Sequence, residues 1–86
     1  MTKESNQLED ELTLRTLREA AELTRPELSK RMNIGTRIIA NWESGEKLPR
    51  VDKFLGLARE LNVSLKTLAK AMKLDVKGIP DDVDAN

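Results

Sequence analysis

Residues 23–45 read LTRPELSKRMNIGTRIIANWESG and predict two short helices joined by a tight turn. The first helix begins at Thr24, because T-R-P-E places a hydroxyl three residues before a carboxylate, as a capping box requires. Pro26 fits the first turn, where its missing N–H leaves no hydrogen bond unmade. Asn33 tolerates the left-handed conformation that ends a helix, so the first helix is expected to end there. The second helix is expected over residues 36–44.

The second helix lies between two glycines and has two different faces. Helical spacing places Ile39 and Trp42 on one face, and we expect both to be buried. Arg37 and Asn41, four residues apart, share the other face. Ile38 lies at the boundary, and its spacing does not decide whether it packs inward.

Apolar residues recur at helical spacing on both sides of this stretch, and no segment alternates with a period of two for long. Thr13 can cap a helix whose inner face carries Leu14, Leu17 and Ala21. A helix that ends near Asn62 carries Val51, Phe54, Leu55, Ala58 and Leu61. Ser64 can cap a last short helix with Leu65, Leu68, Ala69 and Met72 on its inner face. The predicted fold is therefore all-α, a compact five-helix bundle.

The 86 residues carry no net charge, but the charges are unevenly distributed. Residues 1–11 and 74–86 each have a net charge of −3, whereas residues 12–73 hold 13 Lys or Arg against seven Asp or Glu. We expect an acidic extension over 1–12, one domain over 13–73 and an acidic, flexible tail over 74–86. The basic middle is compatible with a polyanionic partner.

Several classes of function are disfavoured by composition. The chain has no cysteine and no histidine, so thiolate chemistry, the commonest general base and the commonest zinc ligand are missing. We therefore expect no cofactor, no metal site and no enzymatic activity. No apolar run approaches the length of a membrane span, so a soluble protein of the cytoplasm is expected, without a membrane partner.

The pattern of residues resembles the helix-turn-helix family of the Cro and phage-repressor type, also called XRE-like and lambda-repressor-like. The resemblance covers about residues 14–72 and rests on L-T-x-x-E-L-S from Leu23 to Ser29, then on Ile39, Trp42-Glu43-x-Gly45, Pro49, Leu55, Ala58, Leu61 and Val63-Ser64-Leu65. It implies a sequence-specific transcriptional regulator that binds double-stranded DNA. The chain departs from the family with Arg25 in place of Gln, Asn33 in place of Gly and Gly35 in place of Ser or Thr.

Base contacts follow from the resemblance, which implies that the second helix of the motif enters the major groove. The implied residues are Thr36, Arg37, Ala40 and Asn41. Arginine can bond guanine O6 and N7, and asparagine can bond adenine N6 and N7. The alternative is that Arg37 and Asn41 form an ordinary solvated face.

Phosphate contacts are implied at the start of the motif's first helix and in the loop after the second. These positions carry Thr24, Arg25, Ser44, Lys47 and Arg50. A helix N-terminus favours a phosphate, and the cations make binding dependent on salt. Lys47 and Arg50 can equally be read as residues that only solubilise a loop.

Structural roles are implied for other residues. Arg18 and Glu43 occupy positions that form an ion pair in relatives, and we expect that pair to orient the second helix of the motif. Relatives bind DNA as two-fold dimers, and a homodimer surface is expected at Leu65, Leu68 and Met72, with Leu8 and Leu12 as an extension. Repression is favoured, because a small domain can block a promoter without contacting polymerase. The alternative is a module that binds a protein partner, such as an antitoxin subunit.

Overall fold

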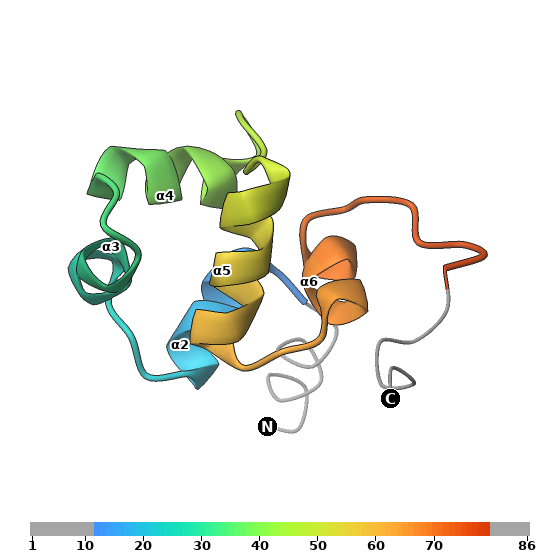
Figure 1. Cartoon of the computed structure of the whole chain (residues 1–86), viewed down its shortest axis with the longest axis horizontal. Helices are drawn as coiled ribbons and strands as arrows, with labels where there is room; N and C mark the ends of the chain where they lie inside the picture. Colours follow the sequence, from blue (N-terminus) through green and yellow to red (C-terminus); the bar gives the residue numbers. More distant parts are fainter. Residues whose placement is uncertain (1–11, 80–86) are drawn as a thin grey trace, which may run out of the picture.

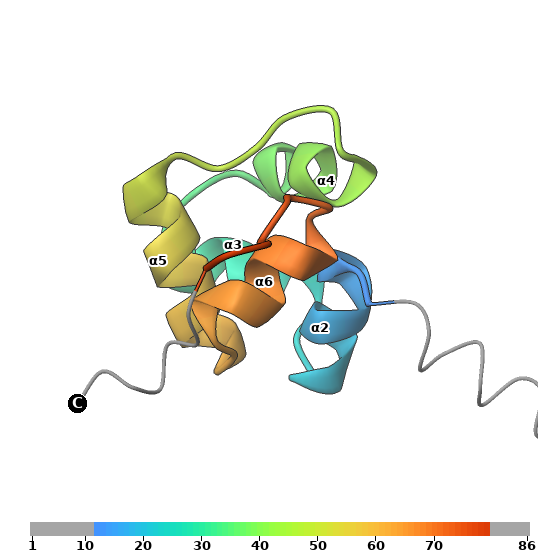
Figure 2. The ribbon, with the colours of Figure 1, turned by 90° about the vertical axis from the view of Figure 1, so that its right-hand side faces the viewer.

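The computed structural model describes residues 12–79, which form five helices and no strand (Figure 1). The helices are α2 (Leu14–Ala20), α3 (Arg25–Met32), α4 (Thr36–Ser44), α5 (Val51–Leu61) and α6 (Leu65–Ala71). The prediction of an all-α bundle is confirmed. Helix α4 lies across one end of α5, and the loop that joins them arches over that end (Figure 2).

Three helices begin at hydroxyl residues that satisfy the first amides of the helix. The side chain of Thr13 accepts from Thr16 N, and that of Ser64 accepts from Thr67 N. At α3, Thr24 Oγ1 accepts from Glu27 N at 3.1 Å, while Thr24 N donates to Glu27 Oε1 at 2.8 Å. The capping residues expected from the sequence are confirmed.

The turn between α3 and α4 is fixed by backbone geometry and by one side chain. Asn33 adopts φ 57°, in the left-handed region that asparagine tolerates better than most residues. The hydroxyl of Ser29 donates to the carbonyl of Ile34, whose own N–H donates back to Ser29 O at 3.1 Å. Ser29 of α3 therefore stabilises the turn through both its side chain and its main chain. The sequence pattern did not indicate this role.

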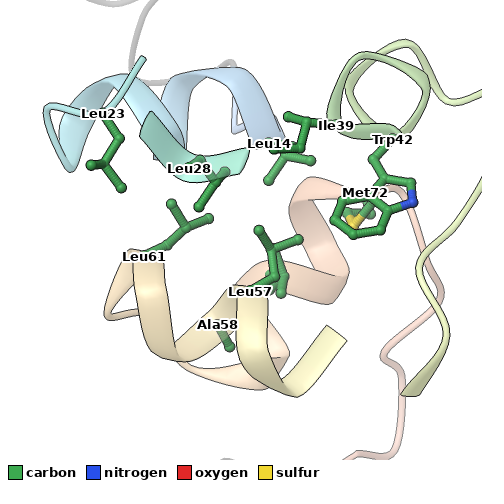
Figure 3. Packing of buried hydrophobic residues seen from close by; sticks show 10 residues of the cluster. Leu14, Leu23, Leu28, Ile39, Trp42, Leu57, Ala58, Leu61 and Met72 are labelled. Carbon is green, nitrogen blue, oxygen red and sulfur yellow. The ribbon is translucent and has the colours of Figure 1, made fainter. Parts of the chain in front are cut away.

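The core lies where α3, α4, α5 and α6 meet, and each of these helices contributes one fully buried side chain. These are Leu28, Ile39, Leu57 and Leu68. Leu14 of α2 and Trp42 of α4 are also buried in the same cluster (Figure 3). The burial predicted for Ile39 and Trp42 is confirmed. Because these residues fix α4 to the bundle, its opposite face is left outward.

The buried face of α5 coincides only in part with the apolar residues that marked this helix in the sequence. Val51 is 75% exposed and Leu55 is 41% exposed, whereas Leu57, which the sequence pattern had not indicated, is fully buried. The buried stripe of α5 consists of Leu57, Ala58 and Leu61, with Phe54 partly buried beside it. Val51 lies at the first position of α5, and Leu55, one turn later, lies at the edge of this stripe.

The dimer surface predicted on α6 must also be corrected. Leu68 is fully buried and Met72 is 8% exposed within a single copy of the chain, so both are core residues. They cannot be offered to a second copy without unpacking the bundle. Leu65 remains exposed. Leu8 lies outside the described residues, and Leu12 is half-buried.

Leu57→Ala and Leu55→Ala make a matched pair for testing the packing of α5. Leu57→Ala should lower the free energy of unfolding by about 2–5 kcal/mol, because a fully buried leucine leaves a cavity. Leu55→Ala should lower it by about 1 kcal/mol or less, because much of that side chain is in water. Urea denaturation followed by circular dichroism measures both. Equal losses would contradict the assignment of Leu57 to the buried face of α5 and of Leu55 to its exposed face.

Candidate nucleic-acid interface

The outward face of α4 carries the residues that the sequence assigned to base contacts. Thr36 and Arg37 are exposed, and Ala40 and Asn41 are half-buried. The side chains of Arg37 and Asn41 make no hydrogen bond or ion pair within residues 12–79. Their donors and acceptors are therefore available to a ligand. Ile38, which the sequence left undecided, is 42% exposed and so lies on the outer side of the helix.

A surface hollow of about 360 Å³ lies on one side of α4, between that helix, the following loop and the start of α5. Its lining comprises Ile34, Ile38, Asn41, Trp42, Lys47, Leu48, Pro49, Arg50 and Lys53. The structure thus brings Asn41 together with Lys47 and Arg50, two of the expected phosphate contacts. Lys53 was missed by the sequence reasoning. The sequence feature that could have indicated Lys53 is its position in the first turn of α5, just after the basic loop.

The three cations of this hollow carry charge that the rest of the described chain does not neutralise. Lys47, Arg50 and Lys53 form no ion pair with a carboxylate among residues 12–79. Lys47 and Arg50 are exposed, and Lys53 is half-buried. This side of α4 therefore presents a net positive charge beside an amide side chain.

A second hollow, of about 530 Å³, lies on the opposite side of α4, toward α2 and the start of α3. It is lined by Thr13, Arg15, Thr16, Glu19, Arg25, Ala40, Glu43 and Ser44. The expected phosphate contacts are therefore split between the two sides: Arg25 and Ser44 on this one, and Lys47 and Arg50 on the other. Arg37 precedes Ala40 by three residues and Asn41 by four, so it lies on the ridge between the hollows.

The backbone amides at the start of α3 are less available to a phosphate than the sequence suggested. The N–H of Thr24 is bonded to the Glu27 carboxylate, the N–H of Glu27 is bonded to Thr24 Oγ1, and Pro26 has none. Helix α3 thus carries its own carboxylate at the place where a phosphate would bind. The donors at this end that the capping box does not use are the guanidinium and the backbone N–H of Arg25.

The capping box also changes the acidity of its carboxylate. The hydrogen bond from the Thr24 amide, then that from the Thr24 hydroxyl, lowers the pKa of Glu27, and the charge of Arg31 adds a smaller effect in the same direction. Each of these interactions favours the ionised carboxylate over the neutral acid. Glu27 is therefore a carboxylate that stabilises the start of α3 at neutral pH.

Glu43, in the last turn of α4, is bonded to arginines of two other helices. Its Oε2 accepts from Arg18 Nε at 2.6 Å, and its Oε1 lies 3.0 Å from Arg25 Nε and 2.9 Å from Arg25 Nη2. Arg18 also donates from Nη1 to Leu23 O at 2.9 Å. The structure brings Arg18 and Glu43 together as the sequence reasoning expected. The bond to Arg25 was not expected, and we call Arg18, Glu43 and Arg25 the Glu43 network.

Residues 14–75, most of the chain, match the family HTH_3, whose members have a helix-turn-helix domain of the Cro and phage-repressor type. The chain belongs to this helix-turn-helix family. No curated protein and no solved structure matches it. Within residues 12–79, no helix has the length and apolar character needed to cross a membrane.

Stability of this helix-turn-helix domain should depend on pH through Glu27. Because its pKa is lowered in the folded state, its stabilising effect is complete above the unfolded pKa and is lost as pH falls through the folded value. Glu27→Ala should therefore lower the free energy of unfolding at pH 7, and its difference from wild type should shrink toward pH 3. Urea titrations at several pH values measure this. Glu46→Ala, which removes an exposed loop carboxylate, is the control and should show no such trend.

Proposed function

We propose that the protein is a sequence-specific DNA-binding regulator of transcription that inserts α4 into the major groove. One observation carries the proposal: α4 lies between two hollows, each lined by a cationic residue assigned to phosphate contact. A helix in the major groove has a phosphate backbone on each side of it. The split of the cations across α4 matches that requirement, whereas a single basic patch would not.

Sequence is read by the outward ridge of α4 in this proposal. Arg37 is the principal base contact, because its guanidinium can bond both acceptors of a guanine. Asn41 bonds an adjacent adenine, and Thr36 with Ala40 provides apolar contact to a thymine methyl. Support comes from the exposure of Arg37 and from the absence of hydrogen bonds to either polar side chain within residues 12–79.

Phosphates of the two strands are bound by separate groups. Thr24, Arg25 and Ser44 contact one strand, and Lys47, Arg50 and Lys53 contact the other. Such contacts position the protein without reading sequence, and they release counterions, so affinity falls as salt rises.

The role of α4 can be tested after an operator has been selected from random duplexes. Arg37→Ala and Asn41→Ala should each weaken operator binding by about 1–3 kcal/mol and leave binding to random duplex nearly unchanged. Lys47→Ala should weaken both and lower the salt slope by about 1. Fluorescence anisotropy at several salt concentrations gives these values. Failure of the wild type to bind any duplex at low salt would refute the regulator proposal.

A homodimer on a two-fold operator completes the proposal, because one short helix reads few bases. The surface that we assign to it combines Leu65 of α6 with Leu74 of the following segment. Both are exposed, and Leu74 N donates to Ala69 O, which holds that segment against α6. The segment lies beside α6 in both views of the chain (Figures 1 and 2). A dimer that covers a promoter would act as a repressor.

Leu74→Glu tests this surface, because a carboxylate there would be buried against a second copy. The variant should be monomeric under conditions in which the wild type is dimeric, and Val51→Glu, on α5, should not change the mass. Analytical ultracentrifugation measures both, alone and on operator DNA. A wild type that stays monomeric at micromolar concentration in solution and on DNA would contradict the dimer.

A protein partner is the second function that a specific observation favours. Ile38 and Leu48 are both exposed and line the same basic hollow, and DNA does not require two exposed aliphatic side chains there. A toxin or another regulator bound at this hollow would compete with DNA for Lys47 and Arg50. Loss of operator binding on addition of such a partner, restored by Leu48→Ser, would support it.

A further inference from the structure

The two sides of α4 differ in how their cations are paired. On the side toward α5 the cations have no carboxylate partner among residues 12–79. On the side toward α2, Arg15 is paired with Glu19 at 3.0 Å and Arg25 is paired with Glu43. A paired arginine is a poor phosphate ligand if its partner cancels its charge. The contribution of Arg25 to DNA binding therefore depends on how the charge of Glu43 is compensated.

The Glu43 network keeps one positive charge, and its burial determines where that charge lies. The Glu43 side chain is 4% exposed and that of Arg18 is 10% exposed, whereas that of Arg25 is 44% exposed. Arg18 therefore neutralises Glu43 from inside the fold. The uncompensated charge is left at Arg25, on the solvent side.

Geometry leaves part of the Arg25 guanidinium uncommitted. Its Nε and Nη2 are bonded to one oxygen of Glu43, and its Nη1 makes no hydrogen bond within residues 12–79. Arg25 lines the hollow beside Ala40 and Ser44 of α4. A carboxylate that holds one edge of a planar guanidinium fixes the direction of its other donors.

We propose that Glu43 positions Arg25 as the phosphate ligand on the α2 side of α4, while Arg18 compensates the carboxylate. Glu43 is thus a positioning residue for DNA binding, in addition to joining the helices. The same carboxylate belongs to α4 and holds Arg25 of α3. The phosphate ligand Arg25 is therefore kept at a fixed distance from α4, the helix that contacts the bases. This inference rests on the proposed function and assigns it a further residue.

A double-mutant cycle tests the positioning, with DNA affinity and salt slope measured for wild type, Arg25→Ala, Glu43→Gln and the double variant. Arg25→Ala should weaken operator and random duplex alike and lower the salt slope by about 0.9. In the Glu43→Gln background, Arg25→Ala should weaken DNA binding less than it does in the wild type, by a factor of about 3 or more. In that background it should also leave the salt slope unchanged.

Outcomes that overturn the inference are distinct from those that refute DNA binding. If wild type binds and Arg25→Ala lowers the slope equally in both backgrounds, Glu43 only supports the fold. If Glu43→Gln strengthens binding and raises the slope, Glu43 sequesters Arg25 instead of presenting it. If wild type binds no duplex at low salt, the proposed function itself is wrong.

Arg25→Lys provides a test that does not depend on the folding of the Glu43 variant. Lysine keeps the charge but lacks a planar group that bonds Glu43 on one edge and phosphate on another. We expect its affinity to fall by a factor of about 3 or more, with wild-type circular dichroism and thermal unfolding. Full affinity and full slope with lysine would overturn the positioning role, because any flexible cation would then suffice. Arg59→Lys, at an exposed position of α5, is the matched control.

Discussion

The buried carboxylate of Glu43 is the constraint on which the arrangement of this chain depends. A charge removed from water must be compensated by partners at hydrogen-bond distance, and breaking one such pair costs several kcal/mol, about 3–5. In this chain the buried partner is Arg18 of α2, which also holds the carbonyl of Leu23, and the half-exposed Arg25 of α3 adds a second, more solvent-screened bond. The end of α4 is therefore determined by polar contacts, and its middle by Ile39 and Trp42 in the core.

Much of the fold could be predicted because it depends on local chemistry. Thr24 with Glu27 marks the start of α3 and Asn33 its end, since each acts through the backbone within a few residues. The spacing of Ile39 and Trp42 determines which face of α4 is buried. Leu57 was missed, and Leu68 and Met72, correctly expected on the inner face of the last helix, were also assigned to a dimer surface that their burial does not allow. Spacing alone gives a periodic face and not the direction in which the neighbouring helices lie.

The candidate site was less predictable than the fold, for a related reason. The base contacts on α4 and the phosphate contacts Lys47 and Arg50 were placed from the resemblance to the family, and they remain predictions. The partner of Arg25 lies 18 residues away, and no local pattern indicates that its guanidinium will meet Glu43. The capping box had a further effect on the site: the residues that predicted the start of α3 also occupy the amides that a phosphate was expected to use.

The backbone carbonyl of Asn41 accepts from Glu46 N at 3.0 Å, from Lys47 N at 3.3 Å and from the hydroxyl of Ser44 at 3.0 Å. The loop that carries the cations is thus tied to the main chain of a residue whose side chain lines the basic hollow. Any amino acid that keeps α4 helical retains that carbonyl. In the proposed mode of binding, the base preference at this position could therefore be exchanged while the loop keeps its anchorage, which would make the domain a scaffold on which new operators could be selected by changing one side chain.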